Sequence, residues 1–278
     1  MSEIDQGNKY ELTQTMHGDF TFKHLQTSEI LHGQVGPRQE AERLYVEQSG
    51  IRETPQSHYV VYDIGMGCGA QLFAMYDAFL ANKSISKLTI VSFDLEKEGL
   101  RLLLENIQYF PYLKENIALI NLLLKTDHLH YSVSNIKEFE WIFLSGDFNK
   151  LSDNDLNFLP SADVICYDFF SPAKHPHLWT YSNFKKLFAK SNLNSVLITY
   201  SSATAVRAAL LAAGYFVGFG AISGKKAKST VATRKLENLL EPLPVAWKNT
   251  FAASSAKFSK QETDKNIIQQ KINSHPQW

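Results

Sequence analysis

The sequence predicts a doubly wound α/β fold built around a mostly parallel β-sheet. Apolar, β-branched runs alternate with segments whose apolar residues recur at helical spacing, which is typical of strands and helices that follow one another along a chain. The first of these strands ends in a glycine-rich turn that leads at once into a helix, and several strands end in an aspartate. Ligands of such sheets bind beyond the carboxyl ends of the strands, so we expect these aspartates to line one crevice.

The composition is that of a globular chain with a sizeable core. The 278 residues are 44% hydrophobic and 20% charged, and 28 Lys and Arg balance 28 Asp and Glu. Net charge therefore neither predicts nor excludes a polyanionic partner, and any nucleic-acid surface has to be local. Cys68 and Cys166 do not suggest a disulfide framework. Because the start of the chain lacks a basic and apolar leader and no run reaches membrane-spanning length, we expect a cytoplasmic protein with no membrane contact.

We expect a central domain with an extension at each end. Residues 1–55 form the first extension, with a polar, frayed start, a short strand, and a helix over 37–49 that begins at a proline. Residues 56–235 form the central domain, and residues 236–278 form a second extension whose polar end we expect to be disordered.

Apolar residues justify each element of the central domain. Runs rich in Val, Ile and aromatic residues predict strands at 59–64, 88–93, 140–144, 162–167, 195–200, 215–221 and 230–233. Apolar residues at helical spacing predict helices at 70–82, 96–110 and 203–213. The segment 117–124 fits either a strand or a helix. The last two strands enclose a lysine-rich connection, which predicts an antiparallel strand inserted late in the sheet.

The glycine loop after the first of these strands discriminates between nucleotide-like ligands. Asp63 precedes Gly65, Gly67 and Gly69, a Gly-x-Gly-x-Gly spacing that differs from the Gly-x-Gly-x-x-Gly of pyrophosphate-binding turns. Glycines there let the backbone approach a ligand closely. A carboxylate at Asp63 would repel a diphosphate but can bind a cationic amino group. The loop and the inserted antiparallel strand therefore favour S-adenosylmethionine over NAD.

Three further acids stand at strand ends. Asp94 can accept both ribose hydroxyls, and Asp147 is placed to contact an adenine amino group; the alternative for each is an ordinary helix N-cap. Asp168 is followed by two phenylalanines and by Pro172, which stiffens the turn. Methylation of an amine needs a desolvated, in-line nucleophile with a free lone pair. Asp168 can accept the hydrogen bond or the proton of such an amine; alternatively, it only caps a turn.

Two other groups of polar residues have weaker implications. His175 and His177 have no third ligand at a matching spacing, so we expect no metal. Residues 224–235 hold five basic residues and no acid. Such a patch suits phosphate contacts through Lys225, Lys226 and Lys228, and it equally suits a solvated hairpin tip.

Three segments carry a family resemblance. Residues 168–180 (Asp-Phe-Phe-Ser-Pro-Ala-Lys-His-Pro-His-Leu-Trp-Thr), residues 199–214, and residues 29–41 ahead of the glycine loop are similar to segments of MnmC-like tRNA methyltransferases. The resemblance covers about residues 20–255. The chain departs from the family pattern at Cys68, at His175 and in the connection 220–224.

The resemblance implies a reaction and a set of site residues. It implies methyl transfer from S-adenosylmethionine to the aminomethyl nitrogen of a modified wobble uridine in tRNA. It assigns the cofactor to Asp63, Gly65, Gly67, Gly69, Asp94 and Asp147, and the acceptor amine to Asp168 and Pro172. The two-domain members of the family also carry an FAD-dependent oxidase, which this chain does not resemble, so we expect a monofunctional methyltransferase. The alternatives are a small-molecule N-methyltransferase, a non-catalytic binding protein of the same fold and, less favoured, an NAD-dependent oxidoreductase.

Overall fold

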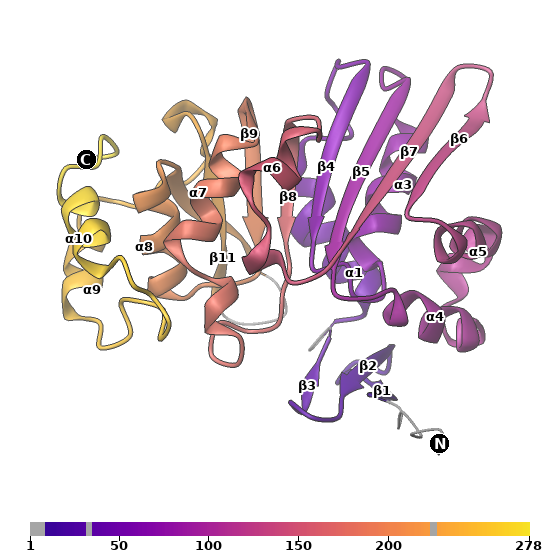
Figure 1. Ribbon diagram of the computed structural model, residues 1–278, viewed down its shortest axis with the longest axis horizontal. Helices are drawn as coiled ribbons and strands as arrows, with labels where there is room; N and C mark the ends of the chain where they lie inside the picture. Colours follow the sequence, from indigo (N-terminus) through magenta and orange to yellow (C-terminus); the bar gives the residue numbers. More distant parts are fainter. Residues whose placement is uncertain (1–8, 32–34, 223–226) are drawn as a thin grey trace.

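A doubly wound sheet forms the centre of the molecule (Figure 1). The computed structural model describes residues 9–31, 35–222 and 227–278. In sheet order, the eight strands are β10 (Phe216–Ile222), β11 (Lys228–Thr233), β9 (Ser191–Thr199), β8 (Ala162–Tyr167), β4 (His58–Ile64), β5 (Lys87–Asp94), β7 (Lys137–Ser145) and β6 (His128–Ser134). Neighbouring strands from β9 to β7 pair in parallel, and β11 lies antiparallel between β9 and β10. The predicted fold class and the inserted antiparallel strand are confirmed.

The switch point of the sheet lies between β4 and β8. From β4 the chain proceeds to β5 and β7 on one side, and it then returns to β8 and β9 on the other side. The loops that leave β4 and β8 therefore diverge to opposite faces of the sheet. This switch point is where open α/β sheets bind ligands.

Helices cover both faces of the sheet and enclose two cores. In β4, Tyr59 and Val61 enter one core while Val60 and Tyr62 enter the other, as the alternation of side chains along a strand requires. The first core is covered by α1 (Pro37–Ala41), the π-helical turn η1 (Glu42–Val46), α2 (Glu47–Ser49), α3 (Ala70–Ala81), α4 (Glu98–Glu105) and α5 (Ile117–Lys125). The second is covered by α6 (Asp153–Asn157), α7 (Tyr181–Ala189), α8 (Thr204–Ala213), α9 (Trp247–Ala253) and α10 (Lys265–Asn273). Short 3-10 turns lie at η2 (Ile107–Tyr109), η3 (Pro111–Asn116), η4 (Phe148–Lys150), η5 (Pro176–Leu178) and η6 (Leu236–Asn238).

A second, three-stranded sheet lies at the carboxyl ends of the parallel strands. It consists of β1 (Tyr10–Gln14), β2 (Phe20–His24) and β3 (Glu29–Ile30), and Figure 1 shows it below the main sheet. An ion pair from Lys9 to Glu96, with 2.6 Å between Nζ and Oε1, joins it to the loop after β5. We predicted only the middle strand of this sheet, because β1 falls in a segment whose polar composition suggested a frayed end.

Two other elements differ from the prediction, and one assignment that was open is now decided. The segment expected as one helix over 96–110 ends its α-helix at Glu105 and continues in 3-10 turns, one of which begins at Pro111. The ambiguous segment 117–124 is helical. Strand β6 was not predicted, because it is an edge strand with mostly exposed side chains and therefore has little apolar pattern to detect.

The end of the chain is a packed helix, whereas we expected disorder. Ile268 and Ile272 of α10 are each 1% exposed and lie four residues apart, on one face of the helix. They join the core beneath α8. The polar composition of this segment hid an amphipathic pattern that buries only two side chains. Within the described part of the chain, none of the helices has the length and apolarity needed to cross a bilayer.

Lys137 caps the C-terminal end of α3, and its replacement is expected to lower the stability of the protein. Its ammonium donates hydrogen bonds to the carbonyl oxygens of Phe79 (2.8 Å) and Asn82 (2.6 Å), which a helix end leaves without partners, and to that of Ile85 (2.8 Å) in the connection to β5. We expect Lys137→Met to lower the free energy of unfolding by about 2–3 kcal/mol, measured by urea denaturation. The exposed Lys125 offers a matched control, and Lys125→Met should change it by less than about 0.5 kcal/mol. Equal stability of the two variants would contradict this role.

Candidate active site

The glycine loop (residues 65–69) and the predicted acceptor loop (residues 168–175) touch at the switch point. Gly65, Gly67 and Gly69 all have positive φ angles (83°, 52° and 75°), and α3 begins directly after them. A Cβ on Gly65 would lie 2.9 Å from the carbonyl oxygen of Asp168. The residue at this position therefore has to be glycine for two reasons, its backbone conformation and the approach of the neighbouring loop. The structure thus brings the predicted cofactor loop and the predicted catalytic acid together.

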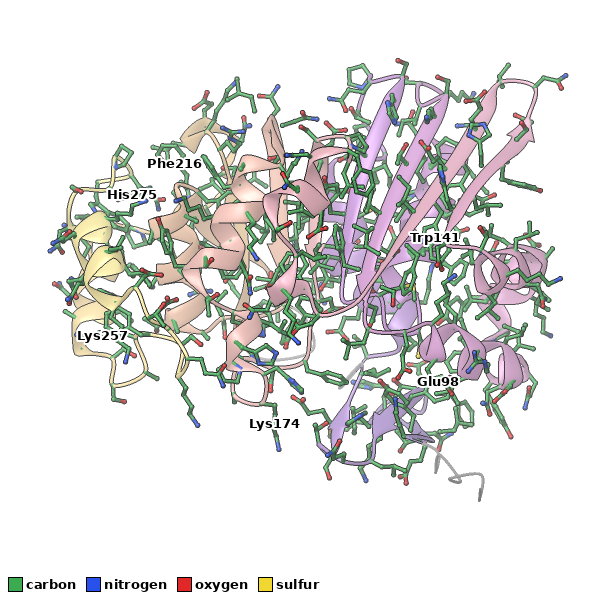
Figure 2. All side chains as sticks on the ribbon, viewed as in Figure 1. Glu98, Trp141, Lys174, Phe216, Lys257 and His275 are labelled. Carbon is green, nitrogen blue, oxygen red and sulfur yellow. The ribbon has the colours of Figure 1, made fainter. Side chains whose placement is uncertain are left out.

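Asp63 is a fully buried carboxyl group with one unsatisfied oxygen. Its Oδ2 accepts a hydrogen bond from Ser92 Oγ (2.7 Å), which in turn accepts one from Trp141 Nε1 (3.0 Å); Figure 2 labels this tryptophan. The nearby Gln71 amide lowers the pKa of Asp63, but its hydrogen bond goes to the carbonyl oxygen of Gly65 (2.9 Å). The Oδ1 atom of Asp63 has no hydrogen-bond partner among the described residues. Burial raises the pKa of Asp63 to about 7. A cationic or N–H group brought by a ligand would satisfy this oxygen.

Asp94 holds the glycine loop from the next strand. Its Oδ2 accepts a hydrogen bond from the Gly67 N–H (2.9 Å), and its Oδ1 accepts one from the Leu95 N–H (2.7 Å). Burial raises its pKa, and these two hydrogen bonds partly offset that rise. The alternative assignment as a helix N-cap does not describe Asp94, because Lys97 occupies the N-cap of α4.

Asp147, by contrast, does act as a cap. Its side chain accepts a hydrogen bond from the Asn149 N–H (3.0 Å) at the start of η4. Its loop nevertheless adjoins that of Asp94, because the Gly146 N–H donates to the Asp94 carbonyl oxygen (2.9 Å). The role of Asp147 toward an adenine therefore stays a prediction.

Three side chains from separate elements fix the loop that follows Asp168. Tyr200 Oη donates to the Phe169 carbonyl oxygen (2.9 Å), and Trp179 Nε1 donates to the Phe170 carbonyl oxygen (2.9 Å). Glu29, on β3 of the small sheet, accepts a hydrogen bond from the Ser171 N–H (3.3 Å). Pro172 lies in the turn closed by the N–H groups of residues 174 and 175 on the Ser171 carbonyl oxygen (both 3.0 Å). The acceptor loop is thus held in one shape around Asp168.

The helix over residues 37–49 contributes two residues that sequence reasoning missed. Burial and the nearby Glu40 carboxylate raise the pKa of Asp168 to about 7, and the adjacent Tyr45 hydroxyl lowers it in part. We predicted this helix, but nothing in the sequence marked Glu40 or Tyr45 as neighbours of Asp168. Its π-helical turn, Glu42–Val46, is a feature often found at functional sites and has no signal in the residues themselves. For Asp63, the missed partner had a weak signal: Ser92 is a polar residue inside an otherwise apolar strand.

Of the other residues singled out in the sequence, Lys228 lies apart from this centre, whereas His175 packs on the loop after Asp168. Lys225 and Lys226 fall outside the described residues. Lys228, at the start of β11, pairs with Glu241 (2.5 Å from Nζ to Oε2). His175 stacks on Phe170, with 5.2 Å between ring centroids. Among the described residues no group of three or more His, Cys, Asp or Glu is arranged to hold a metal.

Replacement of Asp63 by asparagine is expected to weaken cofactor binding and to raise the free energy of unfolding. A folded-state pKa of about 7, above the usual 3.8, means that the native state holds this proton more tightly than the unfolded chain. The contribution of this group to the free energy of unfolding is therefore complete below about pH 4, and it is lost as the pH rises to 7 and the carboxyl group ionises. We expect Asp63→Asn to raise the free energy of unfolding at pH 8 by about 1–4 kcal/mol, with a gain that shrinks steadily toward pH 4. Denaturant melts across this range would measure it; a gain independent of pH would contradict the assignment.

The fold and the site together define a class of protein. A Gly-x-Gly-x-Gly turn at the switch point, a buried carboxyl group before it, and an antiparallel strand inserted late in the sheet are the features of a Rossmann-like methyltransferase.

Comparisons with known proteins identify this class more closely. Residues 125–235 match the model of a family described as S-adenosyl-L-methionine-dependent methyltransferase. An uncharacterized protein of Methanocaldococcus jannaschii is 29% identical over 233 residues, which are 81% of this chain and 59% of that protein. The tRNA 5-methylaminomethyl-2-thiouridine biosynthesis bifunctional protein MnmC of Campylobacter concisus is 28% identical over 203 residues, 70% of this chain and 31% of the relative. The crystal structure of MnmC2 from Aquifex aeolicus has the same fold, with a TM-score of 0.69 at 22% identity, and the match covers 98% of this chain and 86% of that one.

The chain is an S-adenosyl-L-methionine-dependent methyltransferase, and it is similar to part of the MnmC proteins. It spans less than two thirds of the length of the curated relatives described above, and the match to MnmC lies in a part of that bifunctional protein. The site residues fit the cofactor, because the unsatisfied Asp63 oxygen suits its amino group and the Asp94 carboxylate lies at the loop where ribose hydroxyls are expected. When bound, the cofactor supplies a methyl group activated by the positively charged sulfur.

Proposed function

We propose that this enzyme methylates the aminomethyl nitrogen of a modified wobble uridine in tRNA. The observation that carries the proposal is the contact between the two loops: the backbone carbonyl of Asp168 lies directly against Gly65, so an amine held by the Asp168 side chain would be close to the cofactor loop. The names of the MnmC relatives support tRNA as the bearer of that amine.

Asp168 suits the proton transfer that an amine nucleophile requires. An aliphatic amine is mostly protonated at neutral pH, and only the neutral form has a free lone pair. With a pKa of about 7, Asp168 is a stronger base than an ordinary carboxylate and can take one proton from the ammonium group. The neutral nitrogen then forms the new carbon–nitrogen bond as the carbon–sulfur bond breaks and its electron pair remains on sulfur. The methylated nitrogen is then a secondary ammonium group, and Asp168 returns its proton to solvent before the next cycle.

The surroundings of Asp168 favour a cationic acceptor attached to a flat ring. Glu40 adds a second acid beside Asp168. Phe170, two residues further on, contacts the rings of His24 and His175, with 5.3 and 5.2 Å between centroids. Aromatic side chains of this kind stack on unpaired bases.

Direct methylation assays test the proposal. Purified protein would be incubated with labelled S-adenosyl-L-methionine and tRNA whose wobble uridine carries an aminomethyl group, and the nucleosides analysed by mass spectrometry. We expect a 5-methylaminomethyl-uridine product and a rate that falls steeply with salt, because phosphate contacts release counterions. Transfer only to the free nucleoside, with little salt dependence, would instead indicate a small-molecule methyltransferase.

A further inference from the structure

We propose that a second site, formed by Arg207, Phe219 and Lys228, binds a backbone phosphate of the RNA. The inference rests on the proposed function and deepens it, because it identifies where the enzyme holds the chain that carries the target base.

The site is a cavity at the carboxyl edge of the sheet. Its volume is about 340 Å³, and it is lined by Ser202, Arg207, Phe219, Ala227, Lys228 and Glu241. Ser202 follows the end of β9, which neighbours the strand that carries Asp168, and Lys228 begins β11, the next strand. With adjacent strands about 5 Å apart, the cavity lies about 10–15 Å from the acceptor loop. A volume at the lower end of the range for ligand sites suits one nucleotide unit better than a bare ion.

Arg207 places a buried positive charge in this cavity. The residue is 7% exposed, and its Nε and Nη2 donate to Thr230 Oγ1 (2.9 Å) and to the carbonyl oxygens of Lys228 (3.0 Å) and Ser229 (3.2 Å). These partners are neutral. No carboxylate lies within ion-pair distance of Arg207 among the described residues, and burial lowers its pKa to about 10. A buried cation without a counter-charge is unfavourable, and an anionic ligand would supply the missing charge.

Lys228 and Phe219 complete the site. Phe219 lies beneath both cations, with its ring centroid 4.8 Å from the Arg207 guanidinium carbon and 5.8 Å from Lys228 Nζ. The Lys228 ammonium pairs with both Glu241 oxygens (2.7 and 2.5 Å), and their side chains are 43% and 52% exposed. Exposed pairs of this kind contribute little stability, so the ammonium can turn to a phosphate. Two cations against one carboxylate leave the cavity positive, and a guanidinium beside an ammonium suits phosphate oxygens.

RNA binding by three variants tests the site. The probe is a fluorescent anticodon stem-loop with uridine at the wobble position, titrated at several salt concentrations. We expect Lys228→Ala to weaken binding roughly tenfold and to reduce the slope of log affinity against log salt by about one. Glu241→Gln removes the competing carboxylate and should tighten binding. Lys125→Ala, at the far end of the sheet, is the matched control and should bind as the wild type does.

A modified probe locates the phosphate. Stem-loops with one neutral methylphosphonate at successive loop positions would be bound by wild type and by Lys228→Ala. At one position, the neutral linkage should weaken RNA binding by the wild type and leave RNA binding by Lys228→Ala unchanged. The variant already lacks the contact to this phosphate, so it has nothing further to lose there. Arg207→Gln, checked by thermal melting, should behave like Lys228→Ala. If wild type binds RNA and all variants match Lys125→Ala, the site is wrong and the proposed function stands; if wild type binds no RNA, both are wrong.

Discussion

Replacement of Asp168 by alanine is expected to abolish methyl transfer while the affinity for S-adenosyl-L-methionine stays nearly unchanged. In the proposed function the carboxyl group binds the acceptor amine, whereas Asp63 and Asp94 would hold the cofactor. Loss of a positioned base lowers turnover by about a hundredfold to ten-thousandfold. The kcat for tRNA and the dissociation constant from calorimetry measure the two effects separately. Unchanged turnover would refute the catalytic role of Asp168.

The pH dependence of the rate provides a second test of the same residue. Because the carboxyl group is basic only when deprotonated, kcat/KM should rise as the pH increases through about 7. Glu40→Gln removes the neighbouring charge that raises this pKa and should move the rise to lower pH. Tyr45, Tyr200 and Cys166 also face this group, and burial raises their pKa values well above neutral, so they do not titrate in this range.

A matched control for Glu40 lies on the same helix. Glu42 pairs with Arg52, 2.5 Å away, instead of with the acceptor loop. Glu42→Gln should leave the pH profile where it is. A shift of equal size in both variants would show that general surface charge, and not the position of Glu40, sets the basicity of Asp168.

Replacement of Gly99 by alanine is expected to separate α4 from the cofactor loop. A Cβ there would lie 2.1 Å from the Gly67 carbonyl oxygen, a backbone atom that cannot rotate away. In an ordinary helix this change would stabilise by about 1 kcal/mol. Here we expect it to destabilise by about 1–3 kcal/mol and to weaken binding of the cofactor or of S-adenosylhomocysteine at least tenfold, as measured by calorimetry and thermal melting.

Gly50 offers the control for this substitution. Its φ of +70° disfavours a side chain, but a Cβ there would meet nothing within 4 Å. Gly50→Ala should cost about 1 kcal/mol and leave cofactor affinity intact. A Gly99→Ala protein that gained stability and kept its affinity would show that the close approach of α4 is not required.

The convergence of the three acids Asp63, Asp94 and Asp168 was predictable, but their surroundings were not. Asp63, Asp94 and Asp168 each lie at or next to the carboxyl end of a strand. These ends meet at one edge of a parallel sheet, so the order of elements alone places the three residues near one another. Glu40 and Asp168 are separated by more than a hundred residues, and their contact depends on how a helix with a π-helical turn packs on the sheet. No local pattern encodes such a contact.

The same distinction explains the other differences. Asp147 was a candidate because it ends a strand, but a short polar side chain at that position also satisfies its own turn, and the residues do not decide between the two. Gly99 was missed because nothing in a helix marks a glycine that is required by another loop. Helix α10 was missed because the composition of a segment is a poorer guide than the spacing of its few apolar residues.

The hydrogen bond from Ser171 to Glu29 makes the small sheet part of the acceptor site, although all the cofactor residues lie elsewhere. In the proposed function, part of the surroundings of the acceptor therefore comes from a piece of chain outside the main sheet. Exchange of residues 9–31 between relatives could therefore change which amine the enzyme accepts, in evolution or by design. The residues assigned to the methyl donor would stay as they are.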